Sequence, residues 1–350
     1  MDADRSQMLQ DRVRAARADD TPLAIRGGNS KHFLGRTVDG VALDTREHRG
    51  IVSYEPSELV LTARAGTPLA EVEAALTKRG QMLPSEPPHF GAATFGGMVA
   101  AGLSGPRRPW SGSVRDFVLG CRLIDGQARH LRLGGEVMKN VAGYDVSRLL
   151  TGSYGTLGLI TEISMKVLPV PLHRRTLRIV IDAAEALRRL ADWASQPLPI
   201  SGACHDGNAL MLRLEGGHGS VDASSSRLGG EIVDDAFWTQ LRELQLPFFA
   251  GDAPLWRIAL PMTRQLPALP GEVLIDWAGA QLWLRSEDSA AAIRNAVTEL
   301  GGHAECWRGA TAADTPFHPL PPALLALHRR IKQQFDPQGL FNPGRLYAEL

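Results

Sequence analysis

Residues 134–169, GGEVMKNVAGYDVSRLLTGSYGTLGLITEISMKVLP, constrain this chain more than any other segment because glycines interrupt sequence that otherwise forms helices and strands. A glycine inside a regular element costs about 1 kcal/mol relative to alanine, so Gly152, Gly155 and Gly158 indicate positive φ or close ligand approach. The residues that follow, LITEISMKVL, alternate and are β-branched, which is typical of a strand. The segment therefore predicts a large, flat ligand on a loop that leads into a strand.

Composition narrows the class of protein. The 350 residues can bury a sizeable core and predict two or three domains. Lys plus Arg and Asp plus Glu number 38 each, and this balance argues against a nucleic-acid binder, which needs a concentrated basic face. The N-terminal MDADRSQMLQDRVRAARADD is charged and has no apolar core, so we expect no secretory signal and a cytoplasmic location. No window approaches the roughly 18 apolar residues of a membrane span.

The cysteines and histidines are dispersed. Cys121, Cys204 and Cys306 are too few for an iron-sulfur cluster, which normally takes about four cysteine ligands. The ten histidines form no closely spaced pair that would place two imidazoles on one face of an element. We therefore expect no metal site, and any redox chemistry is expected to come from an organic cofactor.

Periodicity and turn residues predict the order of elements. We expect a helix over 7–18, a strand over 22–25 that runs into the glycine-rich loop RGGNSKHFLG, and a strand over 59–63. Thr67 is the expected N-cap of a helix over 68–79, and the Pro- and Gly-rich segment from 80 to 120 is expected to be constrained loop. Asp125 and Gly126 predict a hairpin, so this half of the domain is expected to be antiparallel.

The composition shifts after residue 171. Residues 175–217 predict a strand, then a helix, then further strands over 201–203 and 210–214, and this pattern indicates a second α+β domain. The chain closes with an amphipathic helix that Asp336 and Pro337 are expected to stop, followed by a tight turn at residues 342–344.

Three glycine-rich loops in this order, RGGNS, ATFGGMVAAGLSG and GYDVSRLLTGSYGTLGLITE, resemble the FAD-binding domain of the vanillyl-alcohol oxidase and p-cresol methylhydroxylase (PCMH-type) superfamily. The strings GLSGPRRPWSGSVRDFVLG and FNPGRLYAEL, with the 134–169 segment, are similar to the FAD-binding E subunits of bacterial glycolate oxidases (glycolate dehydrogenases). The resemblance implies an α+β fold: a two-part PCMH-type FAD-binding domain over 1–171, with a small βαβ-type sheet and a larger antiparallel sheet. A smaller α+β cap or docking domain over 172–350 would follow, its C-terminal segment returning toward the flavin domain.

The resemblance also implies the cofactor and its contacts. By position, the first loop would hold the pyrophosphate of FAD, the second loop would line the flavin and ribityl side, and the third would pass along the cofactor. Many relatives bind FAD covalently through a histidine after the paired glycines, and Asn29 at that place predicts noncovalent FAD. The expected contacts are Arg26, Gly27, Gly28, Asn29, Ser30, Thr94, Gly96, Gly97, Ser104, Ser111, Ser113, Gly155, Gly158 and Ile160.

Catalytic residues remain open at the level of sequence. The guanidinium groups of Arg107 and Arg108 offer forked donors to a substrate carboxylate, but they also suit surface charges on a loop or a subunit contact. His89 and His32 sit near the expected cofactor loops, although a lone histidine is more often structural.

The third loop carries further polar candidates. Tyr144 and Asp145 suggest acid and base roles, but Asp145 is better explained as the cap of the helix VSRLL, with Tyr144 packing. Lys139 and Asn140 would orient this loop or touch phosphate. No catalytic base is therefore assigned from the sequence.

The leading hypothesis is an FAD-binding subunit of a glycolate oxidase complex that oxidises glycolate to glyoxylate. The resemblance implies a D-type flavin subunit and an iron-sulfur F-type subunit as partners, a quinone-type acceptor, and membrane contact only peripherally through those partners. Two alternatives stay open: a self-sufficient FAD-dependent 2-hydroxy-acid dehydrogenase, and a scaffold subunit whose flavin site is degenerate.

Overall fold

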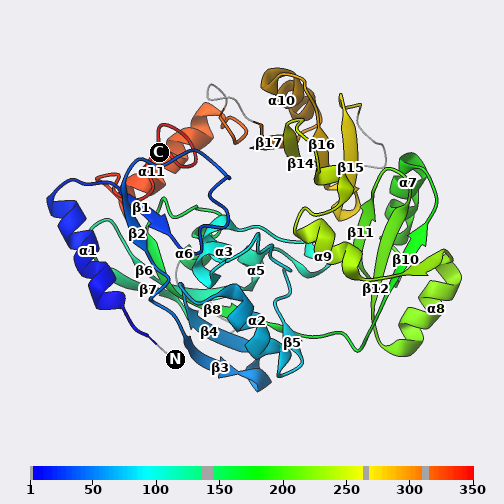
Figure 1. Cartoon of the computed structure of the whole chain (residues 1–350), viewed down its shortest axis with the longest axis horizontal. Coiled ribbons are helices and arrows are strands. Elements are labelled where there is room, and N and C mark those ends of the chain that lie inside the picture. The colour runs from blue at the N-terminus through cyan, green and yellow to red at the C-terminus, as the bar shows by residue number, and fades with distance from the viewer. Residues whose placement is uncertain (1–2, 136–144, 263–267, 310–314) are drawn as a thin grey trace. The chain divides into compact units, whose positions relative to one another are not determined.

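The computed structural model describes residues 3–135, 145–262, 268–309 and 315–350. The chain forms two compact units, each built of helices and strands (Figure 1). Unit 1 comprises Met1–Ser104, Gly112–Val170 and Pro319–Leu350, and unit 2 comprises Gly105–Ser111 and Pro171–His318. The mixed α+β class expected from the sequence is confirmed.

The first part of unit 1 is a small parallel sheet. Strand β1 (Leu23–Arg26) pairs in parallel with β2 (Val41–Asp44), and helix α1 (Ser6–Ala18) runs beside them (Figure 1). Leu9 and Val13, one helical turn apart, are fully buried and join Leu23 and Leu43 in one hydrophobic cluster. The helix expected over 7–18 and the strand expected over 22–25 are both confirmed.

The second part of unit 1 is a larger antiparallel sheet. Its strands follow the order β3-β4-β8-β6-β7. Strand β8, which follows Gly158 as expected, occupies the centre, and a two-stranded ribbon pairs β5 with β9. The strand bounds are β3 Ile51–Glu55, β4 Val60–Arg64, β5 Gln81–Met82, β6 Val118–Ile124, β7 His130–Gly134, β8 Leu159–Lys166 and β9 Leu168–Pro169.

The hairpin between β6 and β7 is confirmed, but its connection is longer than the two expected turn residues. Asp125 Oδ1 accepts hydrogen bonds from Gln127 N at 3.0 Å and Arg129 N at 2.9 Å. Ala128 takes a positive φ of 58°. The buried Asp125 carboxylate thus organises a five-residue loop, 125–129, that replaces a tight turn.

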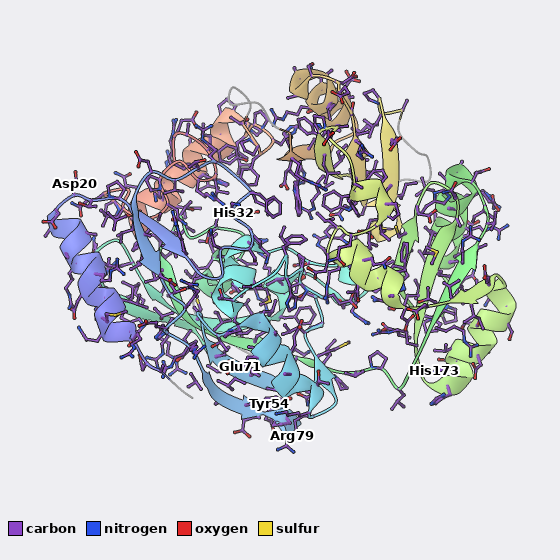
Figure 2. All side chains as sticks on the ribbon, in the orientation of Figure 1. Asp20, His32, Tyr54, Glu71, Arg79 and His173 are labelled. Carbon is purple, nitrogen blue, oxygen red and sulfur yellow. The ribbon has the colours of Figure 1, made fainter. Side chains whose placement is uncertain are left out.

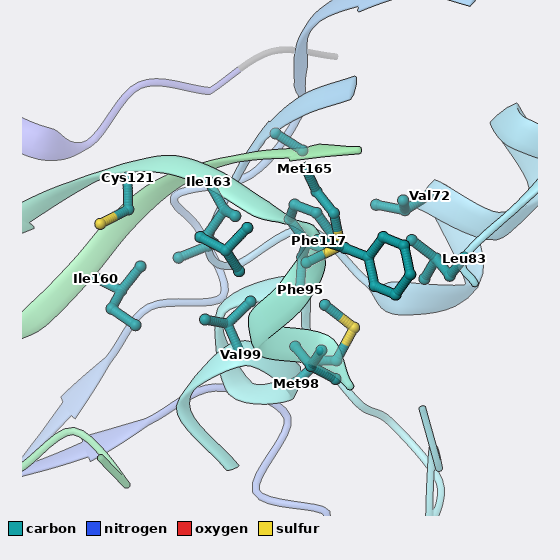
Figure 3. Close-up of a cluster of buried hydrophobic side chains, with 14 of the residues drawn as sticks. Val72, Leu83, Phe95, Met98, Val99, Phe117, Cys121, Ile160, Ile163 and Met165 are labelled. Atoms are coloured by element: carbon teal, nitrogen blue, oxygen red, sulfur yellow. The ribbon is translucent and has the colours of Figure 1, made fainter. Parts of the chain in front are cut away.

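Two expectations about the helices of unit 1 are wrong. The segment from 80 to 120, expected to be loop, contains helix α3 (Phe95–Ala101). Burial of its apolar side chains offsets the low helix propensity of its glycines. Figure 3 shows Phe95 and Val99 of α3 packing with Ile163 and Met165 of β8. Thr67 is not an N-cap.

Thr67 is fully buried, and its hydroxyl forms hydrogen bonds with residues that precede the helix. Its hydroxyl donates to Arg64 O at 2.7 Å and accepts from Gly50 N at 2.9 Å, while Pro68 occupies the N-cap of helix α2 (Leu69–Thr77). Short helical turns complete the unit: η1 Pro56–Glu58, α5 Val114–Phe117 and α6 Val146–Leu149.

Unit 2 is built on one antiparallel sheet with the strand order β13-β10-β12-β11-β15-β16-β14-β17. The strands expected over 201–203 and 210–214 are β11 and β12. The strands are β10 His173–Ile179, β11 Ile200–His205, β12 Leu210–Gly216, β13 Glu231–Val233, β14 Leu255–Ala259, β15 Glu272–Asp276, β16 Gln281–Arg285 and β17 His303–Arg308. The helices are α4 Arg108–Ser111, α7 Ala183–Trp193, α8 His218–Leu228, α9 Ala236–Arg242, η2 Pro247–Phe249, η3 Trp277–Gly279 and α10 Ala290–Glu299.

The last helix, α11 (Pro322–Phe335), belongs to unit 1 and ends before Asp336 as expected. Lys332 is buried in its last turn and donates to Asp336 Oδ2 at 2.7 Å and to Phe341 O at 2.9 Å. Across the described ranges, no helix combines the length and apolar character that crossing a membrane requires.

Candidate functional site

A cavity of about 350 Å³ lies within unit 1, where the three glycine-rich loops meet. The first loop (residues 26–30) follows β1, and residues 93–97 of the second loop begin α3. The third loop, described from residue 145 to 158, leads into β8. His32, labelled in Figure 2, extends the wall on the loop that follows β1. The C-terminal tail contributes Asn342 and Arg345. Segments far apart in the sequence therefore share one cavity.

The first loop presents backbone donors to the cavity. Asn29 has a positive φ of 55°, and in the described part of the chain the amides of Gly27, Gly28, Asn29 and Ser30 donate no hydrogen bond. Successive free amides around a residue with left-handed φ form a concavity that suits an anion. The exposed side chain of Arg26 adds a positive charge at the mouth of this loop.

The glycines of the first loop are required by the second loop. A Cβ on Gly28 would lie 1.3 Å from Ala92 O, and one on Gly27 would lie 2.3 Å from Thr94 Oγ1. Thr94 Oγ1 also accepts a hydrogen bond from Gly97 N at 3.2 Å as the N-cap of α3. The two loops thus touch through their backbones, and no side chain fits between them at Gly28.

The third loop has residues with left-handed backbone conformation and packs against the C-terminal tail. Tyr154 has a φ of 51° and Gly155 a φ of 73°. A Cβ on Gly155 would lie 2.8 Å from Asn342 Nδ2, and one on Gly158 would lie 2.9 Å from Ile124 O. Glycine at these positions is therefore explained by close packing of protein against protein as well as by positive φ.

The charges around the cavity have one sign. Within the part of the chain that the structure describes, its basic side chains are Arg26, Lys31, His32 and Arg345, and no carboxylate is among the lining residues. Burial lowers the pKa of Arg345 below its ordinary value. Free amides and cationic side chains favour a ligand that carries negative charge, such as a pyrophosphate. The donor set fits the dinucleotide expected from the sequence.

The structure brings most of the expected cofactor contacts together. Eleven of them line the cavity: Arg26, Gly27, Gly28, Asn29, Ser30, Thr94, Gly96, Gly97, Gly155, Gly158 and Ile160. The other three, Ser104, Ser111 and Ser113, lie outside its lining.

These three serines make local hydrogen bonds. Ser104 Oγ accepts from Val114 N at 3.1 Å, and Ser113 forms a capping box with Asp116 at the start of α5. The Ser111 hydroxyl donates to Arg107 O at 3.3 Å, within unit 2. Each hydroxyl therefore has a structural role at the end of a short helix.

None of the three catalytic candidates is among the residues that line the cavity. Arg107 is 5% exposed and forms a two-pronged ion pair with Glu215 inside unit 2, so its donor fork is occupied by a carboxylate of the same chain. Arg108 lies over the Trp277 ring, 4.5 Å from its centroid. His89 Nε2 lies 2.9 Å from Glu73 Oε2 in unit 1.

Asp145 caps α6, as expected, by accepting a hydrogen bond from Arg148 N at 3.3 Å. Lys139, Asn140 and Tyr144 lie outside the described residues. Among the residues whose placement is described, no cluster of three or more His, Cys, Asp or Glu side chains could hold a metal ion.

Sequence reasoning expected the C-terminal segment to return toward the flavin domain, but it named as cavity contacts neither the residues of this tail nor several residues next to the loops. Lys31, Ala65 and Tyr154 line the cavity beside expected contacts, while Asn342 and Arg345 come from the far end of the chain. The string FNPGR predicted a turn at residues 342–344, but nothing in its local pattern indicated where that turn packs.

Comparison with known proteins agrees with this site. A family model described as an FAD binding domain matches residues 3–134, and a model of the C-terminal domain of FAD linked oxidases matches residues 317–346. These matches show that the first two loops belong to an FAD binding domain, as the resemblance implied.

Individual relatives extend the comparison. The chain is 59% identical over 350 residues to the glycolate oxidase subunit GlcE of Escherichia coli (strain K12), covering 100% of this chain and 99% of that protein. It is 30% identical over 167 residues to the glycolate oxidase subunit GlcD of Bacillus subtilis (strain 168), covering 47% of this chain and 36% of that protein.

A solved structure supports the fold. An alkyldihydroxyacetonephosphate synthase superposes with a TM-score of 0.67 at 17% sequence identity, covering 96% of this chain and 75% of that chain. This likeness shows that the two chains share a fold.

Proposed function

Because this chain belongs to the family of the glycolate oxidase subunit GlcE, we propose that it is the FAD-binding subunit of a glycolate oxidase (glycolate dehydrogenase) complex. The observation that carries the proposal is identity of 59% along the full chain, which includes all three loops and the tail around the cavity. The chain is an oxidoreductase subunit, and the complex would oxidise glycolate to glyoxylate.

The residues of the cavity fit noncovalent FAD. The free amides of Gly27 to Ser30, with Arg26 beside them, would hold the pyrophosphate, since backbone donors and positive charge both stabilise phosphate oxygens. Asn29 has no nucleophilic atom that would form a covalent link to the cofactor. The chemistry that FAD supplies when bound is two-electron oxidation.

We place the oxidation of glycolate itself in a D-type flavin subunit, with an iron-sulfur F-type subunit carrying electrons toward a quinone-type acceptor. Two observations support this division. The fork of Arg107, the candidate substrate clamp, is occupied by Glu215, and the described cavity lining offers no carboxylate that could act as a base. The present chain would bind its flavin for electron transfer or for stability of the complex. We place this complex in the cytoplasm, with any membrane contact made peripherally through the partners.

Anaerobic reduction by glycolate tests the proposal. The chain purified alone is expected to be yellow, and glycolate is expected to leave its absorbance near 450 nm almost unchanged, whereas the complex co-purified with its partners bleaches rapidly. Flavin and iron counted per complex would establish the partners. Rapid bleaching of the lone chain would instead support a self-sufficient dehydrogenase, and a colourless chain that takes up no added FAD would support a scaffold.

A further inference from the structure

The tail after α11 packs against the strand that leads into the first loop. Leu23 N donates to Leu340 O at 2.7 Å, and Asn342 N donates to Leu23 O at 3.0 Å. Phe341, between them, is fully buried in the cluster beneath α1. Figure 1 shows α11 and the C-terminus beside β1. The tail therefore follows the free edge of the small parallel sheet.

The side chain of Asn342 links two walls of the cavity. Its Oδ1 accepts from Ile25 N at 2.8 Å, at the end of β1, and its Nδ2 donates to Tyr154 O at 2.6 Å in the third loop. Lys332 adds a second tie to that loop by donating to Thr156 O at 2.7 Å. One buried amide thus sets the distance between the first and third loops.

The guanidinium of Arg345 holds the segment that continues the first loop. It donates to Arg36 O at 2.7 Å, to His32 O at 3.1 Å and to Lys31 O at 3.3 Å. These partners are neutral carbonyls, and no carboxylate pairs with Arg345 among the described residues. Arg345 is a half-buried cation with no carboxylate partner among the described residues, and the described lining of the cavity holds no carboxylate, so this wall is electrostatically complementary to an anionic ligand.

We propose that the turn from Asn342 to Arg345 forms one wall of the cofactor site and contributes to FAD binding. Asn342 is a positioning residue that fixes the spacing of the first and third loops, and Arg345 provides positive charge to the pyrophosphate while it orders residues 31–36. The proposal rests on FAD occupying this cavity. It predicts that changes in the tail weaken cofactor binding before they weaken the fold.

Equilibrium binding of FAD to the apoprotein tests the role of Arg345. Arg345→Met is expected to raise the Kd for FAD about 10- to 100-fold and to make that Kd less dependent on salt, because one charge interaction is lost. Arg345→Lys keeps the charge without the fork and is expected to retain the salt dependence. Arg329→Met, on the exposed face of α11, is the matched control and should bind as the wild type does.

The salt dependence of the Kd for FAD distinguishes an electrostatic role of Arg345 from a purely structural one. If Arg345→Met and Arg345→Lys weaken binding equally and neither alters the salt dependence, Arg345 only supports the loop and the charge assignment is overturned. If Arg345→Met binds FAD normally, the whole assignment of Arg345 is overturned. A wild-type apoprotein that binds no FAD would instead contradict the proposed function.

Asn342→Ala tests the positioning role. The variant is expected to weaken FAD binding at least about tenfold without changing its salt dependence, since a neutral hydrogen-bonding group is removed. Asn208→Ala, an exposed amide in unit 2, is the control. Unchanged FAD affinity in Asn342→Ala would overturn the role.

A measurement on the wild type covers the case in which Asn342→Ala does not fold. Addition of FAD is expected to slow hydrogen exchange in the peptide 338–350 together with the peptide 24–32, because the tail and the first loop share the hydrogen bonds of Asn342. Protection of residues 24–32 alone, with no change over 338–350, would show that the tail is not part of the site.

Discussion

Glu215→Gln should destabilise unit 2 because this carboxylate is the centre of a buried ionic cluster. Glu215 is 2% exposed at its side chain, forms the ion pair with Arg107, and accepts from Arg174 Nε at 2.6 Å. Arg213, 1% exposed, lies 3.9 Å from Glu215 Oε2 and donates to Ser201 O at 2.9 Å. The substitution keeps the shape of the side chain and removes its charge.

The magnitude follows from the ionisation of Glu215. Burial alone would raise its pKa, but the hydrogen bond from Arg107 and the charges of Arg213, Arg107 and Arg174 lower the pKa from 4.5 to about 2. This difference corresponds to about 3 kcal/mol of stabilisation of the ionised form. Loss of one partner from a buried ion pair costs a similar amount, about 3 to 5 kcal/mol.

Tryptophan fluorescence reports this unit selectively. All seven tryptophans lie in unit 2: Trp110, Trp193, Trp238, Trp256, Trp277, Trp283 and Trp307. For a unit of this size, about 3 kcal/mol lowers the unfolding midpoint by about 6 to 12 °C. Glu272→Gln is the matched control, because Glu272 is 73% exposed and lies 3.6 Å from Arg285, and a change below about 2 °C is expected there.

The pH dependence gives an independent check. Because the folded state lowers the pKa of Glu215, its stabilisation is complete above pH 4.5 and is lost as the pH falls toward 2. The wild type should therefore lose its advantage over Glu215→Gln across this range. An unfolding midpoint of Glu215→Gln equal to that of the wild type at pH 7 would refute the reasoning.

Three further outcomes are expected. Gly28→Ala should abolish FAD retention, since any Cβ at this position meets backbone, whereas Gly219→Ala, which has open space, should retain FAD. A yellow Gly28→Ala protein would contradict this. Burial, together with the charge of a nearby arginine, lowers the pKa of His48, so stability is full above pH 6.5 and falls as the pH drops below it, by up to about 1.4 kcal/mol per pH unit. Urea unfolding of the wild type and of His48→Gln between pH 5 and 8 should show a shallower slope in the variant. Burial raises the pKa of Cys121 to about 12 and that of Cys204 well above 9, so neither thiol should react with a disulfide reagent at pH 8 until the protein unfolds; modification in the native state would be the contrary result.

The regular elements were predictable where the local pattern decided them. The strand after Gly158, the hairpin around Asp125 and the end of the last helix each follow from alternation or from turn residues within a few positions. Helix α3 was missed because its sequence is poor in helix formers, and burial of Phe95 and Val99 against β8 compensates for this.

The glycines at the site also combine features that local sequence predicts with features that depend on tertiary packing. Their density predicted positive φ or close approach of a ligand, and the sequence order of the loops indicated FAD. Gly152, Gly155 and Gly158 do have positive φ, and the atoms closest to Gly155 and Gly158 belong to the protein itself. The contact that forbids a side chain at Gly28 is Ala92 O, a protein atom more than sixty residues away in sequence. No local pattern predicts that contact, because it depends on how two loops pack.

The sequence by itself determined the order of the loops, the class of cofactor and the positions of most strands, because φ preference, alternation and turn chemistry act over a few residues. Tertiary structure alone decided which polar groups meet. Asn342 reaches Ile25 across 317 positions and Arg107 reaches Glu215 across 108, so their partners are set by packing of whole elements. Packing thus assigned Arg107, a candidate for substrate binding, to the core of unit 2, and brought Arg345 from the last turn of the chain to the cofactor cavity.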